Sequence, residues 1–294
     1  MNAFTRRLAA SLIAGISCLA ISLPATAGAG PAPRLRATLR PASSQRPTAD
    51  DTPLLTYYGG RVLSHVKVDV VVWNSWSYGK TVPLTGAHSI TSFFTGITAS
   101  KYLDWLSEYD TPTQHIGRGT LEGVYTVHPP RTANGSTLSG TQISDALKVL
   151  IDAGQLPKPS TNRLYAIFFR SGQTIVTPDG NSATDFCAYH DTMTYKSSAA
   201  YYAVVPFELR NRGCNPATNS FDDVTTVVSH ELVEGITDPG VGLNRVAWYD
   251  QNNGESADIC AGPGSAAPVI GSDGVRYMVQ RIWSNRAGAC IVTR

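Results

Sequence analysis

The chain has 294 residues, of which 42% are hydrophobic and only 16% are charged, and its formal net charge is +2 at pH 7. This composition excludes a wholly disordered protein, which would combine low hydrophobicity with high net charge. It also gives no electrostatic reason for nucleic-acid binding, because such proteins carry a marked excess of Lys and Arg. The length is sufficient for one large domain or two small ones, each with a sizeable core.

The first 27 residues have the organisation of a secretory signal peptide. Arg6 and Arg7 form a basic start, residues 8–23 are apolar and uncharged, and an A-x-A cleavage pattern ends at position 27. The apolar run of about 16 residues is shorter than the roughly 20 that a spanning helix needs. We therefore expect a secreted protein, extracellular or periplasmic, that has no membrane association after signal cleavage.

Residues 28–52 have the composition of a disordered linker or a pro-segment. Six of the 24 basic residues but only two of the 22 acidic residues precede position 53, so the remainder of the chain has a net charge of −2. The positive excess therefore belongs to the signal and to this segment. One hypothesis is that residues 28–52 are a cleaved pro-segment that holds a cleft shut. The basic residues of the segment 28–52 are Arg34, Arg36, Arg40 and Arg46.

The first elements after position 53 are predicted from hydrophobic periodicity. Residues 63–73 alternate and then become wholly apolar, which is typical of a strand entering a buried sheet. Residues 89–108 have helical periodicity with a break near Gly96. Residues 121–127 predict a strand that ends before two consecutive prolines.

The second half of the chain alternates helices and strands without strict βαβ order. A helix is expected at 139–153, capped by Ser139 or Thr141 and stopped by Gly154. We therefore predict a single α+β domain over residues 53–294, built on a mixed sheet. The remaining predicted elements are strands at 164–169 and 201–206, a helix at 220–237, and a last strand or hairpin at 275–283.

The helix at 220–237 carries the most informative motif, His230-Glu231-Leu232-Val233-Glu234. His230 and Glu234 are one turn apart and therefore lie on the same face. This is the H-E-x-x-H arrangement of zinc-binding helices with Glu in place of the second histidine. We expect His230 and Glu234 to bind zinc and Glu231 to act as the general base. The alternative is a surface helix whose glutamates are solvated.

A zinc site needs a third ligand, and an acidic segment follows the helix. We predict Glu255, 21 residues after Glu234, as this ligand. Asp258 would support the site or exchange roles with Glu255, as acids close to zinc ligands do. The oxygen donors Asp250, Asn252 and Glu255 could instead form a calcium loop.

Four cysteines remain after signal cleavage, an even number that suits an oxidising compartment. We predict the pairs Cys187–Cys214 and Cys260–Cys290, because each closes a modest local loop. His190, close to the first pair, is either a loop histidine packed by its disulfide or a further ligand or oxyanion donor.

The motif resembles two groups of known proteins. The helix looks like that of the gluzincin type of zincin metallopeptidase, with Glu234 at the position of the usual histidine. Larger parts of residues 53–294 resemble the secreted phosphate-induced, EXORDIUM-like proteins, which implies secretion and a role at cell walls or surfaces. The segments that carry this second resemblance are 57–60, 186–190, 229–239, 248–250 and 254–260.

These observations together predict a secreted zinc-dependent hydrolase with a zincin-like α+β fold. We expect a metallopeptidase that acts as a monomer on extracellular peptides or proteins. The alternative is a non-catalytic EXORDIUM-like cell-wall or surface-interaction protein with a structural zinc or calcium site.

Overall fold

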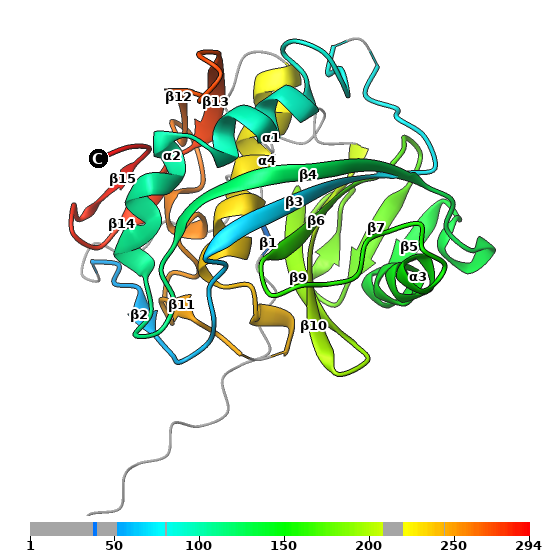
Figure 1. Ribbon diagram of the computed structural model, residues 1–294, viewed down its shortest axis with the longest axis horizontal. Coiled ribbons are helices and arrows are strands. Elements are labelled where there is room, and N and C mark those ends of the chain that lie inside the picture. The colour runs from blue at the N-terminus through cyan, green and yellow to red at the C-terminus, as the bar shows by residue number, and fades with distance from the viewer. Residues whose placement is uncertain (1–37, 40–51, 80, 208–219, 244) are drawn as a thin grey trace, which may run out of the picture. The chain divides into compact units, whose positions relative to one another are not determined.

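The centre of the structure is a six-stranded mixed sheet with the strand order β1-β9-β10-β6-β3-β4 (Figure 1). The computed structural model describes residues 38–39, 52–79, 81–207, 220–243 and 245–294. The pairs β4–β3, β3–β6 and β6–β10 are parallel, whereas β10–β9 and β9–β1 are antiparallel. The strands are β1 (Thr38–Leu39), β3 (His65–Trp73), β4 (Gly117–Val127), β6 (Arg163–Phe168), β9 (Ala188–Tyr195) and β10 (Ser198–Val205).

Burial on both faces explains the apolar sequence of β3, the strand predicted at 63–73. Val68 and Val70 pack into one core cluster, whereas Val71 and Trp73 pack into a second cluster on the opposite face. A strand covered on both sides needs apolar side chains at nearly every position. The two core clusters thus lie on either side of this sheet.

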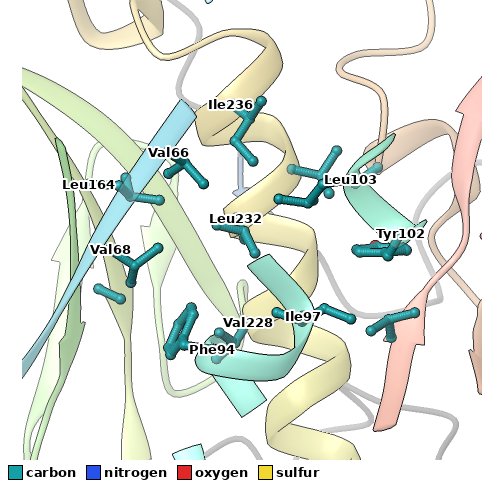
Figure 2. Packing of buried hydrophobic residues seen from close by; sticks show 14 of the residues in the cluster. Val66, Val68, Phe94, Ile97, Tyr102, Leu103, Leu164, Val228, Leu232 and Ile236 are labelled. Carbon is teal, nitrogen blue, oxygen red and sulfur yellow. The ribbon is translucent and has the colours of Figure 1, made fainter. Parts of the chain in front are cut away.

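Helix α4 (Ser220–Thr237) covers the first face and has the bounds that its sequence predicts. Figure 2 shows Val228, Leu232 and Ile236 of α4 among core residues of β3, β6 and the neighbouring helices. Other segments pack around α4, including β9, β10 and β13 (Arg276–Gln280). Helix α4 is therefore enclosed by the protein rather than lying at its surface.

The second face is covered by α3 (Gly140–Asp152), which confirms the helix predicted at 139–153. Ser139 is the N-cap, and its hydroxyl accepts from the Gln142 backbone while the Gln142 side chain bonds back to the Ser139 backbone. This capping box provides acceptors for backbone N–H groups that have no hydrogen-bond partner within the helix. Gly154 follows the helix with φ +71°, a conformation that glycine adopts without strain.

The helix predicted at 89–108 is divided into three pieces, and the predicted break near Gly96 is wrong. Helix α1 (Ile90–Thr98) runs through Gly96, and the break comes at Ala99–Ser100. A Cβ on Gly96 would lie 2.8 Å from side-chain atoms of Asp273 and Tyr277. Gly96 therefore reflects close packing, not the end of a helix. The pieces that follow are α2 (Lys101–Asp104) and the 3-10 helix η1 (Trp105–Tyr109).

Smaller elements surround this framework. The segment predicted as a last strand or hairpin at 275–283 contains β13 and the start of β14, which belong to two consecutive hairpins, β12–β13 and β14–β15. The elements whose bounds have not yet been given are β2 (Thr56–Tyr57), η2 (Arg131–Ala133), β5 (Thr137–Ser139), β7 (Thr174–Thr177), β8 (Gly180–Asn181), η4 (Val241–Leu243), β11 (Trp248–Tyr249), η5 (Asp258–Cys260), β12 (Ala266–Ile270), β14 (Ile282–Ser284) and β15 (Ala289–Ile291).

The architecture is thus mixed α/β, with several sheets and few helices. All described residues fall within one compact unit, Pro33–Arg294. The predicted signal peptide and most of residues 28–52 lie outside the described residues. Within the described part of the chain, no helix is long and apolar enough to cross a membrane.

One of the two predicted disulfides is confirmed. Cys260 is bonded to Cys290, which ties η5 to β15. Cys187 is also disulfide-bonded. Cys214 lies outside the described residues, so the pair Cys187–Cys214 stays a prediction.

Candidate metal centre

Two groups of potential metal ligands lie next to each other at the buried side of α4. One group consists of His230, Glu231 and Glu234, and the other of His190, Glu234 and Glu255. Within each group, one ligand atom of every residue lies within 4.8 Å of the others. Glu234 belongs to both groups, so the five residues form one continuous cluster, called the metal cluster below.

Three separate parts of the chain supply the metal cluster. Helix α4 contributes His230, Glu231 and Glu234. His190 comes from β9, where it is paired with Ala203 of β10. Glu255 follows β11 and directly precedes the segment that forms η5. Residues far apart in the sequence are therefore needed to complete it.

His190 belongs to a strand and not to a loop, contrary to one of the two sequence interpretations. Tyr189 packs into the core cluster on the α3 side, whereas Ala188 packs into the cluster on the α4 side. Because side chains alternate along a strand, His190 faces α4. The available sequence signal was the alternation of the large residues Tyr189, Met193 and Tyr195, which all pack on the α3 side.

The donor atoms are spaced like the ligands of a small divalent cation. Glu234 Oε2 lies 3.0 Å from His230 Nε2 and 3.8 Å from His190 Nε2. His190 Nε2 is 3.1 Å from Glu255 Oε2, and His230 Nε2 is 3.5 Å from Asp258 Oδ1. Metal–ligand distances near 2.1 Å in a tetrahedral zinc site put neighbouring donor atoms about 3.4 Å apart. The observed spacings bracket that value.

Several of these buried atoms lack a hydrogen-bond partner. They are His230 Nε2, Glu234 Oε2 and both carboxylate oxygens of Glu231, although the first two atoms lie 3.0 Å apart as an ion pair. Glu234 Oε1, in contrast, accepts from the backbone N–H groups of Ala257 and Asp258 at 3.1 and 3.0 Å, which leaves Oε2 directed at the imidazoles. An unsatisfied buried polar group costs about 1–3 kcal/mol. A bound cation would satisfy these atoms together, so the residues fit a metal ion.

Gln280 determines which nitrogen of His230 carries the proton in the neutral ring. Gln280 Nε2 donates to the Ala257 carbonyl at 2.6 Å, so its Oε1 is the atom that faces His230 Nδ1 at 3.1 Å. Because Oε1 can only accept, Nδ1 is the donor, and Nε2 presents its lone pair to the cluster. Metal-binding histidines are commonly oriented in this way. Nothing in the local sequence around Gln280 indicates this role.

Burial disfavours the ionised form of several acids in and around the cluster. Burial and the neighbouring carboxylates of Glu234 and Asp238 raise the pKa of Glu255 well above its usual range. Burial likewise raises the pKa of Glu231, and it raises that of Asp238 to about 8. The ion pairs of Glu234 and Glu255 among the described residues involve histidine only. A divalent cation would favour the ionised form of all these acids.

The two histidines differ in protonation. Burial lowers the pKa of His190 to about 4, so this ring is neutral at pH 7. Burial also disfavours the charged form of His230, but the nearby carboxylates of Glu234 and Glu231 outweigh it and raise its pKa to about 10. A cation that binds His230 must therefore displace a proton.

The metal cluster is closed to solvent except at one side. His190, His230, Glu231, Glu234 and Glu255 are each at most 1% exposed, so the alternative of a solvated surface helix is wrong. The exposed fraction of the Asp258 side chain is 24%. Asp258 thus lies between the cluster and solvent, close to where it was expected as a supporting acid.

Asp250 does not join either ligand group. Its Oδ1 accepts from the backbone N–H groups of Asn252 and Asn253, both at 2.9 Å, and its Oδ2 accepts from Leu54 N at 2.6 Å. These bonds hold a turn, and Glu255 instead lies against His190. In the described residues, the structure thus separates two of the oxygen donors considered for a calcium loop.

The four ligand candidates are arranged as a series of neighbours rather than as the predicted triad. His230 and Glu255 fall in different groups, and His190 connects Glu255 with Glu234. No protein-family model and no curated protein matches this sequence, and no solved structure matches the fold. The resemblances to zincins and to EXORDIUM-like proteins therefore stay expectations, and the case for a function rests on the site.

Proposed function

We propose that this protein is a secreted zinc-dependent hydrolase that cleaves peptide bonds. The proposal rests on one observation, the buried Glu234 Oε2, which forms no hydrogen bond of regular geometry and is flanked by the Nε2 atoms of two histidines. His230, Glu234 and Glu255 would hold the metal, and His190 between the two glutamates would be a further ligand. Two imidazoles and carboxylates are the donors that zinc prefers in hydrolytic sites.

Glu231 is the residue best placed to act as general base. A bound zinc would acidify a water molecule and polarise the carbonyl of a peptide bond. Glu231 lies within 4.8 Å of the His230 and Glu234 donor atoms, and neither of its oxygens is engaged in a hydrogen bond. Burial raises the pKa of its carboxyl, which makes the ionised carboxylate a stronger base than that of an exposed glutamate.

The decisive experiment measures metal content and peptide hydrolysis in the wild type, in Glu231→Gln and in the control Glu122→Gln. Glu122 is a partly exposed glutamate of β4 that pairs with Lys67. We expect one zinc per chain in all three proteins. Hydrolysis should be sensitive to chelators and should fall about 10²–10⁴-fold in Glu231→Gln alone. A purified protein without zinc would contradict the proposal.

A non-catalytic protein with a structural metal is the second candidate, and the burial of the cluster favours it. Four protein ligands close a tetrahedral site, as in structural zinc centres. Such a protein would contain zinc, lose stability on chelation and hydrolyse no peptide. Glu231 argues against this candidate, because a structural site does not need a further unpartnered carboxylate.

A further inference from the structure

The chain's own N-terminal segment pairs with the strand that carries His190. β1 is antiparallel to β9, with Thr38 opposite Tyr189 and Leu39 opposite Ala188. Tyr189 directly precedes His190 in the sequence. β1 therefore occupies the outer edge of the six-stranded sheet immediately beside the metal cluster.

Further along β9, the turn that follows α4 packs against Thr192. Thr192 Oγ1 donates to the Pro239 carbonyl, and η4 packs against β9. Gly242 approaches so closely that a Cβ there would lie 2.7 Å from Thr192 N. The part of the β9 edge that pairs with β1 is thus the part next to His190.

We propose that the outer edge of β9 at Ala188–Tyr189 binds an extended peptide, and that Thr38–Leu39 of the chain itself occupies it as an internal inhibitor. An added strand gains affinity from backbone hydrogen bonds, so an edge of this kind accepts many peptide sequences. This inference builds on the proposed peptide hydrolysis. A substrate strand on β9 would lie beside His190, and it would have to displace β1 or await its removal.

The test uses the secreted protein with the double substitution Thr38→Pro/Leu39→Pro. Proline has no N–H and cannot form a ladder hydrogen bond through its nitrogen. The control is Ser43→Pro/Ser44→Pro, which adds the same number of prolines to the segment outside β1. Because successive N–H groups of a strand point to opposite neighbours, only one of the Ala188 and Tyr189 amides can be protected by β1. We expect hydrogen exchange at that amide to become about tenfold faster or more in the β1 variant only.

A binding measurement with a synthetic peptide of residues 34–44 complements the exchange experiment. The β1 variant should bind this peptide, and the wild type should bind it at least about tenfold more weakly, because its edge is occupied. The same peptide with prolines at the positions of Thr38 and Leu39 should not bind. Peptide hydrolysis by the β1 variant should exceed that of the wild type.

Two results would overturn the inference. Unchanged exchange at Ala188 and Tyr189 would show that β1 does not protect this edge, and equal binding of the peptide to both proteins would place it elsewhere. Exchange and binding need neither metal nor catalysis. A zinc-free protein would therefore defeat the proposed hydrolase alone, whereas a zinc hydrolase with unchanged exchange would defeat this inference alone.

Discussion

At the scale of single residues, hydrogen bonds to one side-chain atom of a ligand candidate fix the direction of its other donor atom in the metal cluster. Glu234 has one oxygen held by two backbone amides and the other directed at His230 Nε2, 3.0 Å away, so its carboxylate has a fixed direction. His230 has Nδ1 held by Gln280, so its Nε2 is directed at the cluster. Atoms that are oriented in advance lose less entropy when a metal binds.

Gln280 should therefore affect metal affinity although it is not a ligand. Gln280→Leu removes the partner of His230 Nδ1, and we expect zinc affinity to fall about 10–100-fold, as for other residues that orient metal ligands. Competition with a chromogenic chelator measures this change. Gln173→Leu is the matched control, since Gln173 is equally buried and its Nε2 also donates to a backbone carbonyl, that of Gly135. Equal affinity loss in both variants would indicate a general loss of structure.

Zinc binding should release protons, and the two histidines should differ in this respect. The pKa of His230, about 10, is above pH 7, so this ring is protonated in the metal-free protein at pH 7. The pKa of His190, about 4, is below pH 7, so this ring is neutral. Zinc affinity should thus rise as the pH increases towards 10. Calorimetry in buffers of different ionisation enthalpy counts the protons. Zinc binding to the His230→Asn variant should release about one proton fewer than binding to the wild type. The His190→Asn variant should release as many protons as the wild type.

At the scale of elements, tight packing around α1 and α4 can override the intrinsic secondary-structure propensity of a residue. Gly96 lies inside α1, although glycine is about 1 kcal/mol less favourable than alanine in a helix. The turn between β12 and β13 approaches this position closely enough to leave no room for a Cβ. Packing between elements therefore outweighs helix propensity at this point.

Gly96→Ala should consequently destabilise the protein. We expect a loss of about 1–3 kcal/mol in the free energy of unfolding from overpacking, opposed by about 1 kcal/mol of improved helix propensity. Denaturant titration measures the balance. Gly135→Ala is the control, because its nearest neighbour would be 3.5 Å from the new Cβ, an ordinary contact. If Gly96→Ala stabilised the protein instead, the β12–β13 hairpin would be able to move away from the new Cβ at little energetic cost.

At the scale of the whole molecule, the metal cluster depends on segments that are tied together from distant parts of the chain. The disulfide Cys260–Cys290 links η5, which begins at Asp258, to the C-terminal hairpin. Glu255 lies just before η5, and the amides that hold Glu234 belong to Ala257 and to Asp258, the first residue of η5. The covalent bond therefore restrains the loop that supplies one side of the cluster.

Removing this bond should lower both stability and metal affinity. For a separation of 30 residues, the chain-entropy model predicts a loss of about 3–4 kcal/mol in the Cys260→Ser/Cys290→Ser variant. Thermal unfolding with and without zinc measures it. Added zinc should recover part of the loss, because a ligand that binds only the folded state stabilises it. If saturating zinc did not restore any stability to the variant, the disulfide and the metal cluster would be energetically independent.

The sequence by itself determined those features that depend on neighbours along the chain. The helix Ser220–Thr237 and the placement of His230, Glu231 and Glu234 on it followed from helical periodicity and from the motif. Helix α3, with Ser139 or Thr141 as its cap, and the buried strand β3 followed equally from local patterns. Such features are encoded within one or two turns of chain, so a single sequence suffices to predict them.

Only the tertiary structure decided how the metal cluster is completed. His190 lies 65 residues from Glu255, and Gln280 lies 50 residues from His230, yet each pair is in contact. These contacts depend on the pairing of β9 with β10 and on the packing of the β12–β13 hairpin against α4. Sheet register and packing bring together residues that no local pattern relates. The sequence therefore indicated the chemistry of the helix, whereas the fold decided which residues accompany it.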